Sequence, residues 1–322
     1  MSRALQLREG DLMVRRAWSR VTIGALVLTM CSAGGAWADV QPDAPWGLAR
    51  ISQREPVGPG PWRYSYDSTA GQGVDVYVVD TGIDTEHPEL KGRTSWLANV
   101  TGDGTDKDCN GRGTHLAGTV GATTYGVAKK VTLYAVKVAR CDGTATTKDL
   151  IEGINRATTN ARSTRRPSVM LIGPTQRNDD ALNQAANDAA EAGVVVVAPA
   201  GDESQDACNI SPASARRVLT VGATNKNDQT SVFSNYGSCM HLLGPGEDIV
   251  STWIGGSGAT RAQSGTAMAA AHAAGLAAYL IALEGSKSPS DVKRRLQEYS
   301  TKGRLSGLTS GPNYLLFNNY QR

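Results

Sequence analysis

The 322-residue chain has little net charge, few phenylalanines and few histidines. Its formal net charge is +3, so the composition gives no reason to expect nucleic acid or an anionic membrane as a partner. It contains 4 histidines and no Cys-x-x-Cys spacing, which argues against a metal site built from cysteine and histidine. The 36 glycines beside 2 phenylalanines instead predict many tight turns and closely packed backbone segments.

Long hydrophobic runs are also scarce near the N-terminus, where residues 21–30 are too few for a membrane-spanning helix. Arg15, Arg16 and Arg20 precede this run, and Ala36-Trp37-Ala38 after it fits a small-x-small cleavage signal. We therefore predict that residues 1–38 are a signal peptide and that residues 39–322 form one exported domain. A membrane anchor or a buried helix is the alternative for the apolar run.

The predicted exported domain contains four cysteines, Cys109, Cys141, Cys208 and Cys239. An even number of cysteines in an exported chain predicts disulfide bonds. Four cysteines permit three pairings, and the residues alone do not choose among them. A metal site is the alternative, which the cysteine spacing disfavours.

One apolar run, residues 73–79, is rich in β-branched residues and predicts a buried strand that ends at Asp80. Open α/β sheets place their sites at the carboxyl ends of parallel strands. Asp80 is therefore a candidate site residue. The alternative is an aspartate that hydrogen-bonds within its own turn.

An alanine-rich stretch, residues 264–275, reads Ser-Gly-Thr-Ala-Met-Ala-Ala-Ala-His-Ala-Ala-Gly. It has no wide polar face and therefore predicts a buried helix, whose first turn would favour negative charge. The stretch resembles the nucleophile segment of the subtilisin-like serine proteases, Gly-Thr-Ser-Met-Ala-x-Pro-His-x-Ala-Gly. Asp80-Thr81-Gly82 matches the aspartate motif of that family. Residues 44–54 resemble the start of the mature domain in its proteinase K and aqualysin branch.

The resemblance extends from about residue 44 to the end of the chain and implies a fold and a disulfide pairing. The fold is expected to be α/β, the subtilisin-like three-layer α/β/α arrangement with a mostly parallel central sheet. No propeptide is recognised in front of it. The implied bridges are Cys109–Cys141 and Cys208–Cys239.

Three positions that carry the chemistry of the family are replaced, while Asp80 keeps the triad aspartate. Ala267 stands at the serine position, and a methyl group cannot attack a carbonyl. Arg112 stands at the first histidine of His-Gly-Thr-His, where a permanently protonated side chain cannot act as a base. His115 matches the second histidine, which is not the base. Asp202 replaces the asparagine that donates to the oxyanion, and an ionised carboxylate repels that charge.

The segment that lines the specificity pocket of the family is altered as well. Gly173-Pro174-Thr175 stands where the family has three glycines. Pro174 lacks an N–H group, and Thr175 adds bulk. A substrate strand is therefore expected to meet a different edge.

The replacements predict a secreted, catalytically inactive homologue that binds a peptide or protein through the former cleft. We expect a monomer, with neither nucleic acid nor a membrane as partner. We also expect Arg112 to form a charge-assisted pair with Asp80 near Ala267. The alternative is that Arg112 turns outward into solvent.

A calcium ion is the cofactor that the resemblance brings into question. One family site takes a carboxylate where this chain has His241, a poor calcium ligand. We therefore expect no metal at that position and no other cofactor, although the resemblance allows calcium elsewhere.

Residual hydrolysis is the alternative function. Ser264 or Thr266 would then act as a displaced nucleophile, with His115 or His272 as base. This requires a hydroxyl and a ring nitrogen within hydrogen-bond reach of each other.

Overall fold

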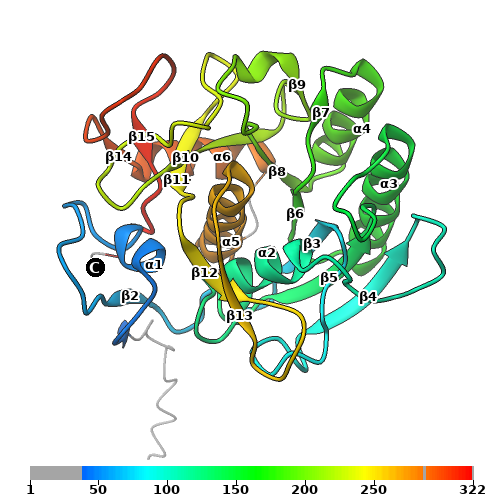
Figure 1. The fold of residues 1–322 in the computed structure, drawn as a ribbon, viewed down its shortest axis with the longest axis horizontal. Coiled ribbons are helices and arrows are strands. Elements are labelled where there is room, and N and C mark those ends of the chain that lie inside the picture. The colour runs from blue at the N-terminus through cyan, green and yellow to red at the C-terminus, as the bar shows by residue number, and fades with distance from the viewer. Residues whose placement is uncertain (1–37, 286–287, 321–322) are drawn as a thin grey trace, which may run out of the picture. The chain divides into compact units, whose positions relative to one another are not determined.

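The computed structural model describes residues 38–285 and 288–320 (Figure 1). The predicted signal peptide lies outside these residues apart from Ala38. The described residues from 38 onward belong to one compact unit.

A nine-stranded sheet forms the centre of the domain. Its spatial order is β14-β15-β11-β10-β8-β6-β3-β5-β4. All neighbouring strands are parallel except β14 and β15, which confirms the predicted mostly parallel α/β sheet. The strands in spatial order are β14 (Thr301–Lys302), β15 (Tyr314–Leu315), β11 (Leu242–Pro245), β10 (Leu219–Thr224), β8 (Val195–Pro199), β6 (Ser168–Ile172), β3 (Asp75–Asp80), β5 (Thr132–Lys137) and β4 (Thr94–Asn99).

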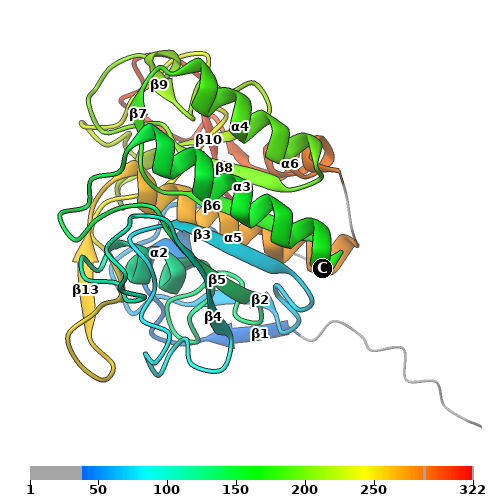
Figure 2. The ribbon, with the colours of Figure 1, turned by 90° about the vertical axis from the view of Figure 1, so that its right-hand side faces the viewer.

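Helices cover both faces of this sheet, as Figure 2 shows from the side of α3 and α4. Alternation along β3 explains the two layers: Val76 and Val78 pack into one apolar core, and Tyr77 and Val79 pack into the other. One face carries α3 (Thr147–Thr164) and α4 (Asp180–Glu191), and the other carries α2 (Arg112–Gly121) and α5 (Thr266–Glu284), against which α6 (Pro289–Tyr299) packs.

Short elements surround the three layers. They are α1 (Trp46–Arg50), the antiparallel pair β1 (Ala38–Gln41) and β2 (Tyr64–Asp67), the antiparallel pair β12 (Ile249–Thr252) and β13 (Thr260–Gln263), the antiparallel pair β7 (Gln176–Arg177) and β9 (Ile210–Ser211), and a 3₁₀ turn at Ala207–Asn209.

The alanine-rich helix α5 runs through the core, as its sequence predicts. Its length and composition would allow it to cross a membrane, but 89% of its most apolar 18-residue stretch is buried inside the fold. Its small side chains allow close approach: a Cβ on Gly275 would lie 2.7 Å from the Cβ of Val127. Packing within the domain therefore accounts for the composition of this helix.

The position of β3 in the sheet determines where the candidate site lies. Strand β3 lies between β5 and β6, and the chain moves to opposite sides of β3 to form these two neighbours. Such a switch point leaves a crevice at the carboxyl ends of the strands. Asp80 ends β3 there, and Gly173 follows β6 directly.

Candidate active site

Arg112 and Asp80 form an ion pair at the carboxyl end of β3. The Nε atom of Arg112 donates to Oδ1 and Oδ2 of Asp80 at 2.9 and 3.1 Å. The Asp80 side chain is fully buried, and that of Arg112 is 28% exposed. The predicted pair is therefore confirmed, and the alternative of an outward-turned Arg112 is wrong.

The electrostatics of this pair differ from those of an acid–base couple. Burial raises the pKa of Asp80, whereas the charge and hydrogen bonds of Arg112 and the Thr81 N–H lower it, leaving a net upward shift. Arg112 also donates from Nη2 to the carbonyl of Gly143 at 3.2 Å. The guanidinium thus holds a buried carboxylate and a neighbouring loop, and it has no lone pair with which to accept a proton.

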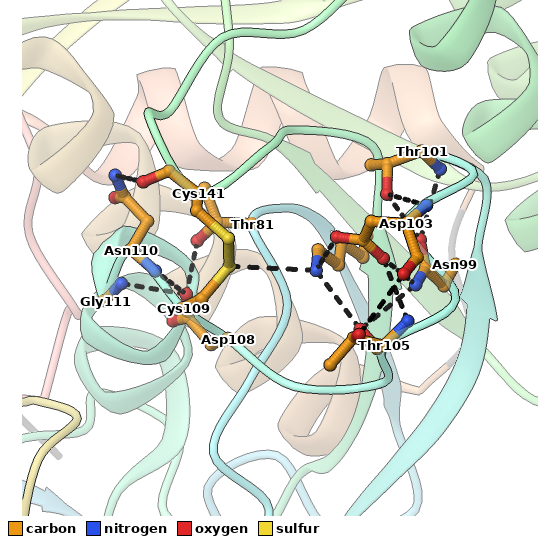
Figure 3. Close-up of polar contacts among 11 residues, drawn as sticks. Thr81, Asn99, Thr101, Asp103, Thr105, Asp108, Cys109, Asn110, Gly111 and Cys141 are labelled. Carbon is orange, nitrogen blue, oxygen red and sulfur yellow. Dashed lines mark hydrogen bonds and ion pairs between the residues drawn. A yellow bond between two sulfur atoms is a disulfide. The ribbon is translucent and has the colours of Figure 1, made fainter.

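Asp108 fixes the turn that presents Arg112, a role that the sequence analysis missed. Its buried carboxylate accepts five hydrogen bonds, which come from Thr81 Oγ1, the backbone N–H groups of Asn110, Gly111 and Thr114, and Thr114 Oγ1. Figure 3 shows part of this set around Asp108. The available signal was an aspartate a few residues before the helix that begins at Arg112, since aspartate is favoured near the N-terminal ends of helices.

Both predicted disulfides are present, Cys109–Cys141 and Cys208–Cys239. The first joins the loop before α2 to the loop after β5, and Asn110 Nδ2 donates to the Cys141 carbonyl across the same junction (Figure 3). This bridge therefore ties together the two loops that hold Arg112.

A buried lysine lies beside the first disulfide. Lys137 pairs with Asp103, and its Nζ is 3.9 Å from Cys109 Sγ. Asp103 and the two cysteines of this bridge form a cluster of metal-ligand residue types. The disulfide removes both thiolates, and Lys137 takes the carboxylate, so the cluster is not a metal centre.

Asp202 lies at the N-terminus of α5, next to Ala267. The Thr266 N–H donates to Asp202 Oδ1 at 2.7 Å, and Gly201 N–H donates to Thr266 Oγ1 at 3.1 Å. Although Asp202 is exposed as a residue, partial removal of its carboxyl group from water raises its pKa, and the bonds from Thr266 and the charge of Arg112 lower it. A carboxylate thus occupies the helix end that would stabilise a developing anion.

The altered segment 173–175 packs directly behind Asp80. A Cβ on Gly173 would lie 1.9 Å from Asp80 Oδ2, so this position requires glycine. Pro174 is buried and Thr175 is half-buried. Gln176 follows and donates from Nε2 to the Ala145 carbonyl at 2.7 Å, which places the segment beside the loop after β5.

The two histidines proposed as displaced bases are engaged elsewhere. His115 Nε2 contacts the Ile249 carbonyl at 2.8 Å, and His272 Nδ1 contacts the Met268 carbonyl at 2.9 Å. Burial lowers the pKa of each ring to about 4. Across residues 38–285 and 288–320, no hydrogen bond joins a serine or threonine hydroxyl to a histidine ring nitrogen.

The two hydroxyls proposed as displaced nucleophiles have backbone donors. Ser264 Oγ accepts from the Asp248 N–H at 2.9 Å, and Thr266 Oγ1 accepts from Gly201. The fold therefore brings together Asp80, Arg112, Asp202 and the Gly173 segment, but they supply no nucleophile–base pair among the described residues.

Comparisons with known proteins find relatives that belong to one protease family. The model of the Subtilase family, Peptidase_S8, matches residues 71–312. Psp3 of Schizosaccharomyces pombe, a subtilase-type proteinase, is 43% identical over 285 residues, which are 86% of this chain and 63% of psp3. Proteinase T of Parengyodontium album is 47% identical over 248 residues, 76% of this chain and 82% of that protein.

A solved structure, that of a cold-adapted subtilisin-like serine proteinase, superposes with a TM-score of 0.79 at 37% identity. The match covers 86% of this chain and 98% of the other. The chain spans less than two thirds of the length of psp3, and more of the shorter relatives. Family match, sequence identity and fold agree, and the chain belongs to the subtilase family, peptidase S8, among proteinase K-like relatives.

Proposed function

We propose that this protein is a subtilisin-like homologue that does not hydrolyse peptide bonds and instead binds a peptide or protein in the former active-site cleft. One observation carries the proposal: Arg112, which the resemblance aligns with the catalytic histidine, forms an ion pair with the buried Asp80, and Ala267 stands at the aligned serine position. Both carboxylate oxygens of Asp80 accept from Arg112 Nε, and Oδ1 also accepts from the Thr81 N–H, so an arginine takes the contact that the resemblance gives to an imidazole.

Acyl transfer by the family needs a nucleophile, a general base and an oxyanion donor, and each of the three aligned positions holds another residue type. Ala267 has no atom that can form the acyl bond, and Arg112 cannot take a proton at any ordinary pH. Loss of one oxyanion donor costs about 10²–10³ in rate. Asp202 costs more than that loss, because its carboxylate brings negative charge to the same helix end.

Binding remains compatible with the structure because the segments around Asp80 and Arg112 are well supported. The Cys109–Cys141 bridge and the Arg112–Gly143 bond hold the loops next to Arg112, and Gly173 is packed against Asp80. The two disulfides and the N-terminal signal expected from the sequence support an extracellular location. We further propose a monomer that acts without nucleic acid, a membrane or a cofactor.

Binding can be tested by panning a displayed peptide library against the purified domain, residues 39–322. Thr175→Trp adds bulk in the half-buried segment that follows Gly173 next to Asp80, whereas Thr159→Trp adds the same bulk on exposed α3. Peptides that bind the parent and the Thr159 variant but lose at least about tenfold affinity for the Thr175 variant support the proposal, since a clash in a pocket typically costs 1–3 kcal/mol. Equal binding to all three proteins, or no enrichment, contradicts it.

The second candidate function is hydrolysis by Ser264 or Thr266, which the family membership favours. A fluorophosphonate probe labels an activated hydroxyl, so intact-mass analysis separates the two readings. We expect no adduct on the parent, because neither hydroxyl contacts a histidine. A one-to-one adduct on Ser264 or Thr266 would establish the alternative.

A further inference from the structure

The position where the family resemblance places a calcium-binding carboxylate holds a histidine and a lysine instead. His241 precedes β11, and Lys293 comes from α6. Lys293 Nζ lies 2.8 Å from His241 Nε2 and donates to the Val218 carbonyl at 3.2 Å. The other ring nitrogen, Nδ1, accepts from the Thr220 N–H at 3.1 Å.

This set of groups does not fit calcium. Calcium takes six to eight oxygen ligands, with carboxylates among them. Among the described residues, the polar side-chain contacts of His241 and Lys293, apart from the one that joins them, are to one backbone N–H, that of Thr220, and one carbonyl oxygen, that of Val218. An amine and an imidazole within hydrogen-bond distance of each other supply neither the negative charge nor the oxygen ligands that a calcium ion needs.

We propose that the amine of Lys293 replaces calcium as the group that ties the amino ends of β10 and β11, at Val218 and His241, to helix α6. The contacts are mutually consistent for the uncharged amine: Nδ1 accepts from the Thr220 N–H, so Nε2 carries the ring proton, and the lone pair of neutral Lys293 accepts that proton while one of its N–H groups donates to Val218. Burial lowers the pKa of Lys293 to about 8, and burial together with Lys293 lowers that of His241 to about 4. This inference does not depend on whether the crevice binds a ligand.

The test compares four proteins: the parent, His241→Asp, Lys293→Ala, and the double variant His241→Asp/Lys293→Ala. Each Tm is measured in millimolar calcium and in EDTA, and the difference is the calcium increment. Comparing increments cancels any calcium site elsewhere. We expect Lys293→Ala to lower the Tm in both buffers, and His241→Asp to keep the parent's increment because the amine then pairs with the new carboxylate.

The double variant is expected to gain a calcium increment of about 5–10 °C over the parent, which corresponds to binding at a hundredfold excess over Kd. Equal increments in the parent and the double variant would overturn the proposal, as would an unchanged Tm for Lys293→Ala. If the double variant does not fold in either buffer, His241→Asp decides: an unchanged increment supports the amine as the occupant, and a larger increment overturns it.

Discussion

Replacing Arg112 with alanine should destabilise the folded protein in a way that depends on pH. Asp80 is fully buried, and Arg112 supplies the opposite charge and a hydrogen bond to both oxygens. Without the guanidinium, the carboxylate keeps only the N–H of Thr81 among its described partners. A buried charge left without its partner is among the more costly consequences of a single substitution.

The magnitude follows from the burial of the two side chains. Breaking a buried ion pair costs about 3–5 kcal/mol. Arg112 is 28% exposed, so water can enter its place and recover part of that energy. We therefore expect a loss of about 2–3 kcal/mol, or about 5–10 °C in Tm for a domain of this size.

The pH dependence has a definite sign. Arg112 holds the pKa of Asp80 below the value that burial alone would impose. In Arg112→Ala the folded-state pKa rises further above its unfolded value, so the folded variant holds a proton that the unfolded chain has released. Its stability therefore falls as pH rises through that window, and the deficit against the parent shrinks as pH falls toward the ordinary carboxyl range.

Thermal unfolding monitored by circular dichroism, repeated from about pH 4.5 to pH 8, measures this deficit. Arg217→Ala is the matched control, because its pair with Glu191 is about half exposed; that change should stay within about 0.5 kcal/mol. Asp80→Asn added to Arg112→Ala should recover part of the loss. A deficit equal to that of the control, or one that does not vary with pH, would refute the reasoning.

Three further outcomes can be checked by urea unfolding. Asp108→Ala should cost about 3 kcal/mol or more, since it leaves buried donors unsatisfied; a loss below 1 kcal/mol would count against its positioning role. Cys109→Ser with Cys141→Ser should cost about 4 kcal/mol, as expected for a loop with a sequence separation of 32 residues; an unchanged midpoint would contradict this. Gly173→Ala should prevent stable folding because its Cβ meets Asp80 Oδ2 at 1.9 Å, and a parent-like midpoint would show that the strand yields.

Much of the fold was predictable because its elements carry strong local signals. The sequence of residues 289–299 has a helical pattern, and helix α6 has these bounds, with a serine cap and a proline in its first turn. The sequence also predicts a helix over 147–158; α3 continues to Thr164, because Ala161 still packs into the core and Arg165 ends the helix in a left-handed conformation. End positions depend on such tertiary contacts, which periodicity alone does not reveal.

The Arg112–Asp80 pair was predictable because Arg112 stands at the position that the resemblance gives to the partner of the triad aspartate. The five bonds to Asp108 were not, because they join residues from two separate segments of the chain. The contact of Lys293 with His241 was likewise hidden, since 52 positions separate them. Only the tertiary packing of α6 next to the amino ends of β10 and β11 brings this amine to the ring.

The central claim is that Arg112, Asp202 and Ala267 remove hydrolysis from an intact subtilase scaffold. The most direct measurement is hydrolysis of casein and a fluorogenic peptide library by residues 39–322, beside the variant Arg112→His/Asp202→Asn/Ala267→Ser and a mock preparation. The account predicts that the parent equals the mock preparation and that the triple variant cleaves. Cleavage by the parent that a serine-directed inhibitor abolishes would contradict it.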